Sequence, residues 1–253
     1  MSSDVSASRD AATSSAGSAP LRVLLISHEP EAAPAIIGQM LRARGVLTDQ
    51  HVILVDGEEP DVGFPDLAAY DLVISFGSFT NAYDPQAQGW VQAEVGLIRE
   101  MVAADKAFLG VCFGGQLLGM ALGGEVERAP DGQEEVGVVE MVPERDGLPI
   151  PAGPWFAWHE DRIVLPEGID VLARTDRAVQ MFRAGRAVGL QFHPEVDLAL
   201  VADWLRIGEH HLPAGWTSEQ LLTTWAQVEP EAHRNCEQLV DWLLEDVVRG
   251  DAA

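Results

Sequence analysis

Three short apolar segments in the first half of the chain constrain its fold more than any other feature. They run from Leu21 to Ile26, from Asp71 to Ser75 and from Ala107 to Val111. Each is dominated by leucine, isoleucine, valine or phenylalanine without alternating polar residues, which is typical of strands buried on both faces of a parallel sheet. A sheet of this kind needs helices on both faces, so the segments predict an α/β fold.

The stretches between and after these segments complete the predicted architecture. Helical patterns extend from Glu31 to Arg44 and from Trp90 to Ala104, and a further strand is predicted from His51 to Val55. Beyond Glu125 the pattern changes to short extended pieces separated by proline and glycine turns, at 137–142, 178–182 and 187–192. We therefore expect a mixed, mainly parallel central sheet flanked by helices, with a ligand site at the carboxyl ends of its strands.

The C-terminal part of the chain is predicted to be helical, at 198–207, 218–227 and 231–248. A length of 253 residues favours one well-buried domain over two. We expect a disordered tail at 1–20, a domain at 21–207 and a helical extension at 208–253 that packs on it. Four tryptophans of this helical part fit such packing better than docking of another subunit, although a homodimer stays an alternative: Trp204, Trp216, Trp225 and Trp242.

Charge and composition exclude several classes of protein. The chain carries 40 acidic against 16 basic side chains, a net charge of −24 that repels phosphate backbones and argues against nucleic-acid binding. No apolar stretch approaches the ~18 residues of a membrane span, and the N-terminus lacks the apolar core of a secretory signal. Two cysteines are too few for a disulfide-stapled secreted domain. We expect a cytoplasmic protein with reduced thiols and no membrane partner.

Cys112 lies at a predicted strand-to-helix turn with glycines on both sides, in the sequence Gly110-Val-Cys-Phe-Gly-Gly-Gln116. A nucleophile on a tight turn needs small neighbours, because the backbone approaches adjacent strands closely. The N-terminus of the next helix favours the thiolate, and N–H groups beginning with that of Phe113 point toward a developing oxyanion. Glycine-rich turns also bind phosphates, and free cysteines are often simply buried, so the turn alone leaves these alternatives open.

A candidate general base follows the last predicted strand, in Gln191-Phe-His-Pro-Glu195. In extended or turn geometry, residues two apart can point to the same side, so Glu195 could accept a hydrogen bond from the His193 imidazole and fix its tautomer. The alternative is a loop histidine followed by an acidic first helical turn. No set of residues has metal-ligand spacing, so we predict neither a metal nor a cofactor.

Together, the segments around Cys112 and His193 resemble the two signature motifs of class I glutamine amidotransferase domains. The resemblance extends over about 21–207 and implies a flavodoxin-like fold with a Cys112, His193 and Glu195 triad. Ser75-Phe-Gly-Ser-Phe-Thr-Asn-Ala-Tyr-Asp84 is similar to the family's oxyanion loop, which implies that the Gly77 N–H joins that of Phe113. Ser78 replaces the proline that is usual in this loop.

Further substrate contacts are implied by the same resemblance. Gln116 matches the family's contact to the amino-acid end of the substrate, and Glu135-Val-Gly-Val138 is similar to the segment whose backbone grips that end. The resemblance thus implies contacts from Glu135, Gly137 and Val138. His159 belongs to a segment like the family's His-Gly-Asp loop, in which Glu160 replaces the glycine.

Three functions are compatible with these residues. The first is a GMP-synthase-like glutaminase that forms a Cys thioester, releases glutamate and ammonia from glutamine, and passes the ammonia to a separate synthetase. We expect a separate partner because no Ser-Gly-Gly-x-Asp phosphate loop is present. The second is a stand-alone hydrolase of γ-glutamyl amides or peptides. The third is a catalytically silent binding or regulatory homologue, which the intact triad disfavours.

Overall fold

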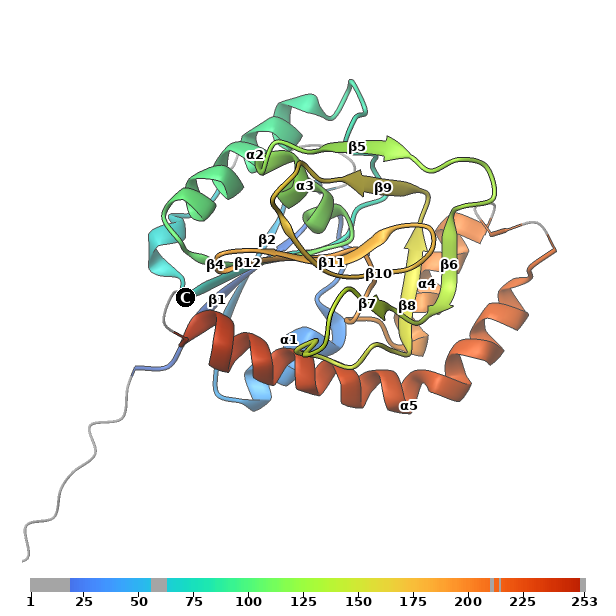
Figure 1. Cartoon of the computed structure of the whole chain (residues 1–253). Coiled ribbons are helices and arrows are strands. Elements are labelled where there is room, and N and C mark those ends of the chain that lie inside the picture. Colours follow the sequence, from blue (N-terminus) through green and yellow to red (C-terminus); the bar gives the residue numbers. More distant parts are fainter. Residues whose placement is uncertain (1–18, 56–62, 210–211, 214, 251–253) are drawn as a thin grey trace, which may run out of the picture.

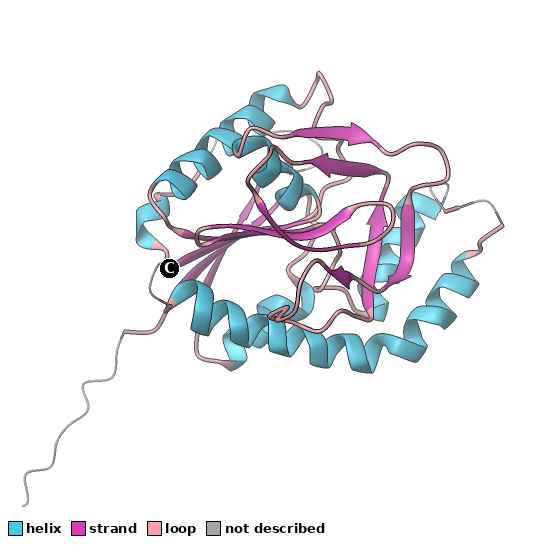
Figure 2. Ribbon diagram, in the orientation of Figure 1, coloured by secondary structure: helices cyan, strands magenta, loops and turns pink. Residues whose placement is uncertain are grey.

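A central sheet of eight strands organises the computed structural model, which describes residues 19–55, 63–209, 212–213 and 215–250. Residues 1–18 of the predicted tail lie outside the described residues. Neighbouring strands pair in parallel from β2 to β12 and antiparallel from β12 to β7. In spatial order (Figures 1 and 2) the strands are β2 (Leu47–Val52), β1 (Arg22–Ser27), β3 (Leu72–Ser75), β4 (Ala107–Val111), β12 (Ala187–Leu190), β11 (Val179–Ala184), β10 (Asp170–Arg174) and β7 (Val142–Pro143).

Alternate residues of the inner strands serve two separate cores. In β1, Val23 and Leu25 belong to one apolar cluster, whereas Leu24 and Ile26 belong to another on the opposite face. Helices α1 (Ala35–Ala43) and α5 (Ser218–Trp242) contribute to the first cluster, and α2 (Gln88–Ala103) and α3 (Phe113–Ala121) to the second. The prediction of a mainly parallel sheet between helices is confirmed, because both faces of its inner strands are apolar.

Two small antiparallel pairs stand beside the main sheet. One joins β5 (Glu125–Arg128) to β9 (Asp161–Val164), and the other joins β6 (Glu135–Val139) to β8 (Trp155–His159). The His193 N–H donates to the carbonyl of Phe156 at 2.7 Å, which ties β8 to the segment that follows β12. The remaining elements are a 3₁₀ turn at Leu67–Ala69 and helix α4 (Leu198–Gly208).

The second strand differs from the prediction. We expected His51 to Val55, but β2 occupies Leu47–Val52. Pairing with β1 sets these bounds, since Leu47 is in register with Arg22 and Val52 with Ser27. Strand β2 lies at the edge of the sheet and is largely exposed, so it contains polar residues. A search for uninterrupted apolar segments therefore does not find it.

The C-terminal helices also differ from the prediction, which placed a break between Gln227 and Glu231. Helix α5 instead runs unbroken from Ser218 to Trp242 with Pro230 inside it, and π-helical turns continue from Leu243 to Val248. A proline in a helix interior costs about 3 kcal/mol. Burial on both sides of Pro230 offsets this cost, with Leu221, Trp225, Cys236, Leu239 and Val240 all buried. The helix curves along the molecule (Figure 1).

The C-terminal extension covers the same face of the sheet as α1 and shares its core cluster. The division at residue 207 stays a prediction. Among the helices described, none is both long and apolar enough to cross a membrane.

Candidate active site

The turn between β4 and α3 holds Cys112 in a strained backbone conformation. Its φ is 50° and its ψ is −103°, in the region that side chains other than glycine rarely adopt. A Cβ atom on Gly114 would collide with the Ser75 carbonyl, and one on Gly115 would collide with the Leu190 carbonyl. The glycines therefore let the turn sit between the ends of β3 and β12, and the Cys112 thiol lines a pocket.

His193 and Glu195 form a buried pair. Nδ1 of His193 lies 2.7 Å from Oε1 of Glu195, and the two residues are 4% and 1% exposed. Burial disfavours a charged imidazole, but the Glu195 carboxylate and the Cys112 side chain, which is hydrogen-bonded to His193, outweigh it and raise the pKa of His193 to about 10. The pair thus holds a protonated imidazole, a potential proton donor, beside the sulfur.

The backbone N–H groups of Gly77 and Phe113, which line the same pocket as this sulfur, are the candidate oxyanion donors. The peptide that carries the Gly77 N–H is held by a 3.1 Å hydrogen bond from Gly114 N to Phe76 O. Phe113 is the first residue of α3, where N–H groups have no intrahelical acceptor. Within the described part of the chain, no acceptor takes a hydrogen bond from either N–H. A Cβ at Gly77 would lie 2.9 Å from Cε1 of His193, so a side chain here would crowd the imidazole.

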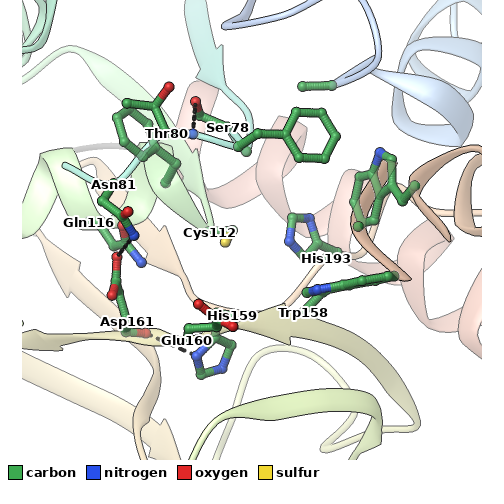
Figure 3. Close-up of a pocket in the computed structure, with 16 residues that line it drawn as sticks. Ser78, Thr80, Asn81, Cys112, Gln116, Trp158, His159, Glu160, Asp161 and His193 are labelled. Carbon is green, nitrogen blue, oxygen red and sulfur yellow. Dashed lines mark hydrogen bonds between the residues drawn. The ribbon is translucent and has the colours of Figure 1, made fainter. Parts of the chain in front are cut away.

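A cavity of about 130 Å³ opens above Cys112. Figure 3 shows the sulfur between two different walls: Asn81, Gln116 and Asp161 on one side, and His193 and Trp158 on the other. The predicted site residues that line it are Gly77, Cys112, Phe113, Gln116, His159 and His193. The pocket thus brings these six residues together, and the roles assigned to them stay predictions.

Three residues predicted to contact the substrate lie outside the pocket lining. Glu135 is buried behind His159, with its Oε2 3.2 Å from His159 Nε2 and 2.7 Å from Gln180 Nε2. Gly137 faces Leu221 of α5, and Val138 packs against the apolar cluster around Trp204. A direct substrate contact by Glu135, Gly137 or Val138 stays a prediction.

Several pocket residues were not assigned from the sequence. Asn81 Nδ2 donates to Asp161 Oδ2 at 2.7 Å, and the Tyr83 hydroxyl donates to Asp161 Oδ1 at 2.9 Å. These bonds tie the loop after β3 to the start of β9, and Asp161 O also lies 3.0 Å from His159 Nδ1. Both segments had been singled out from the sequence, but no sequence signal pairs side chains about 80 residues apart. Trp204 was predicted only as a packing residue.

In the portion of the chain that the structure describes, no group of three or more histidine, cysteine, aspartate or glutamate side chains is arranged to hold a metal ion. The groups that the structure brings to the pocket are the thiol, the imidazole of the His193–Glu195 pair and backbone N–H groups.

A cysteine on a strand-to-helix elbow with a buried His–Glu pair defines the general class of thiol hydrolases and transferases. Comparison with known proteins narrows this class. The family model for class-I glutamine amidotransferases matches residues 36–202, which is more than half of the chain. The chain belongs to the class-I glutamine amidotransferase family.

Individual relatives agree with this assignment. A GMP synthase [glutamine-hydrolyzing] of Thermomicrobium roseum is 40% identical over 134 residues, which cover 49% of this chain and 23% of the relative. The chain thus matches less than a quarter of that curated relative's length. A glutamine amidotransferase structure from Thermotoga maritima has a TM-score of 0.77 at 27% identity and covers 89% of this chain and 99% of its own. A glutamine amidotransferase from Methylobacillus flagellatus, at 22% identity, shares the fold with a TM-score of 0.75 over 90% of this chain and 95% of its own.

Proposed function

We propose that the protein hydrolyses the γ-carboxamide of glutamine through a γ-glutamyl thioester on Cys112. One observation carries this proposal: the Cys112 elbow, the 2.7 Å His193–Glu195 pair and two N–H groups meet at one pocket. Neither N–H group has an acceptor among the residues that the structure describes. Family membership supports the same chemistry.

In the first step the Cys112 thiolate attacks the γ-carbonyl carbon. A carbon–sulfur bond forms, and the carbonyl oxygen becomes an oxyanion that accepts hydrogen bonds from the Gly77 and Phe113 N–H groups. The His193 imidazolium gives its proton to the departing nitrogen, the carbon–nitrogen bond breaks, and ammonia leaves. Glu195 holds the ring in the orientation that points its other nitrogen toward the sulfur.

In the second step water hydrolyses the thioester. His193, now neutral, takes a proton from the water, and the resulting nucleophile attacks the same carbonyl carbon. The same two N–H groups stabilise the second oxyanion. Glutamate leaves, and the Cys112 thiolate and His193 imidazolium return to their starting forms. The polar wall with Gln116, Asn81 and Asp161 would hold the amino-acid end of the substrate throughout.

The proposed acceptor of the ammonia is a separate synthetase. Relatives named GMP synthase [glutamine-hydrolyzing] match this chain over only 18% to 23% of their length, and their name joins glutamine hydrolysis to GMP synthesis in one longer chain. For this protein we propose that the same two activities are divided between two chains in the cytoplasm.

A second candidate function is hydrolysis of a γ-glutamyl amide or peptide without a partner. The observation that favours it is the apolar wall on the His193 side of the pocket. The Trp204 ring meets the His193 ring edge-on with centroids 4.8 Å apart, and Trp158 lies edge-on to Trp204 at 6.3 Å. Because His193 protonates the departing nitrogen, a substituent on that nitrogen would lie against these rings. Ammonia, the leaving group from glutamine, has no apolar substituent that could bind to these rings.

Steady-state glutamate release from two substrates separates these functions. We expect the purified protein to release glutamate from L-glutamine and from γ-glutamyl-p-nitroanilide, with Cys112→Ala inactive on both. A kcat/KM that favours the anilide by at least tenfold, and a Trp204→Ala variant that loses this preference, support the hydrolase, because the aromatic substituent then uses the tryptophan wall. Glutamine turnover that rises when a cognate synthetase is added supports the amidotransferase. A protein inactive on both, alone and with a synthetase, would contradict the proposal and favour a silent homologue.

A further inference from the structure

A second buried histidine lies beneath the pocket and is not used by the chemistry described above. His28 follows the end of β1 and is 0% exposed. Its Nε2 lies 2.9 Å from Glu94 Oε2, and Glu94, on α2, is 1% exposed. The other carboxyl oxygen of Glu94 accepts a hydrogen bond from the buried Ser75 hydroxyl at 2.8 Å. A complete ionisable network is thus enclosed in the protein, where charged groups persist only when they are paired.

The far end of this network reaches the candidate oxyanion loop. Nδ1 of His28 lies 2.9 Å from the Gly77 carbonyl oxygen. A carbonyl can only accept a hydrogen bond, so Nδ1 must carry a proton and donate it. Burial lowers the pKa of His28, but the Glu94 carboxylate outweighs burial and raises it above its ordinary value. The imidazole therefore has a proton available for each neighbour.

His28 also contacts the second candidate donor. Its ring meets the Phe113 ring edge-on with centroids 4.7 Å apart. Trp90 of α2 packs against the same two rings, at 5.5 Å from His28 and 5.6 Å from Phe113. The His28 side chain thus hydrogen-bonds Gly77 and packs against Phe113, the two residues whose N–H groups are the candidate oxyanion donors.

The Gly77 backbone is consequently fixed on both sides. Gly114 N donates to the carbonyl before Gly77, and His28 donates to the carbonyl of Gly77 itself. A glycine without these bonds could rotate about φ and ψ more freely than any other residue, and its N–H would lose its direction. Misplacement by about 1 Å can lower a rate about 10²-fold.

We propose that His28, anchored by Glu94 and Ser75, is a positioning residue that sets the direction of the Gly77 N–H and its distance from the Phe113 N–H. The role rests on the proposed function, because it acts through the oxyanion that forms at Cys112. It predicts that disruption of the network lowers kcat while KM for glutamine stays within about twofold, since the oxyanion exists only in the transition state and the intermediate.

The test compares three variants of the full chain with glutamine and γ-glutamyl-p-nitroanilide as substrates. The double variant His28→Leu/Glu94→Leu removes both charges together, so neither is left buried without a partner. His28→Asn keeps a side-chain N–H at the position of Nδ1, within reach of the Gly77 carbonyl. Ile98→Ala is the matched control, because Ile98 is buried on the same face of α2 one turn beyond Glu94 and its truncation destabilises the fold without touching the network. Thermal unfolding is measured for each protein.

We expect the double variant to lose about 10²-fold in kcat with little change in KM, and His28→Asn to recover at least about tenfold of that loss. Ile98→Ala should have a lower Tm but a kcat near that of the wild type. A double variant with wild-type kcat would overturn the positioning role, and so would a loss of kcat no larger than that of Ile98→Ala. Either result would leave the proposed function intact. If the wild type itself turns over neither substrate, the proposed function is wrong and the role of His28 falls with it.

Discussion

Cys112→Ala protein is expected to release glutamate from glutamine at least about 10⁴-fold more slowly than the wild type, with an unchanged fold. Alanine cannot form the thioester, and the oxyanion donors and the imidazole cannot activate water at the position of the lost sulfur. The side chain is 7% exposed at the floor of the pocket, so its removal leaves little new cavity. Glutamate release from glutamine, together with circular dichroism of each protein, provides the measurement.

The chain contains its own matched control in Cys236, the only other cysteine. It is 0% exposed on α5, and burial raises the pKa of its thiol far above the ordinary value, so it stays protonated and inert. We expect Cys236→Ala to lower the Tm by a few degrees and to keep the wild-type kcat. If the two alanine variants lose equal activity, the nucleophile assignment is wrong.

The second large loss of activity is expected when His193 or its carboxylate partner Glu195 is replaced. His193→Gln should lower kcat by about 10²- to 10⁴-fold, because no group remains to protonate the departing nitrogen or to deprotonate water. Glu195→Gln keeps the shape of the site and removes the charge that raises the pKa of His193. The pKa of His193 should then fall. The reactive imidazolium–thiolate pair will lose its proton at lower pH, and the alkaline limb of the kcat/KM profile should move in that direction.

The matched control for both variants is His233→Gln. His233 lies on α5, and its Nε2 is 3.7 Å from Glu229 in a pair with partial exposure, which contributes little to stability. This variant should keep the wild-type rate and pH profile. An alkaline limb that stays in place in Glu195→Gln would contradict the role given to the Glu195 carboxylate.

The sequence predicted the inner strands and the chemical centre because both have local signals. Strands β1, β3 and β4 are apolar on both faces, and the elbow at Cys112 needs glycines within a few residues. Strand β2 was misplaced because an edge strand carries polar residues that only its pairing with β1 explains. Helix α5 passes through Pro230 because tertiary packing on both sides outweighs the local cost.

The rest of the site depends on contacts between distant segments. Asn81 meets Asp161 across 80 residues, and His28 meets Glu94 across 66. No pattern in the chain pairs these side chains, because only the fold brings the segments together. Asn81 and His28 follow the carboxyl ends of β3 and β1, whereas Asp161 begins β9 and Glu94 lies on α2. For the same reason the pairing of Glu135 with His159 was not predicted, and its substrate contact stays a prediction.

Covalent labelling tests the central claim, that the Cys112 sulfur attacks the γ-carbonyl carbon of a glutamyl group. The probe is a glutamine analogue with a diazomethyl ketone in place of the carboxamide, which forms a stable thioether with an attacking thiolate. Mass spectrometry of peptides from the labelled wild type identifies the modified residue. We predict one label per chain, on Cys112, with loss of activity in proportion to labelling and protection by glutamine. Full inactivation with the label on any other residue, or full activity in protein labelled at Cys112, would contradict the account.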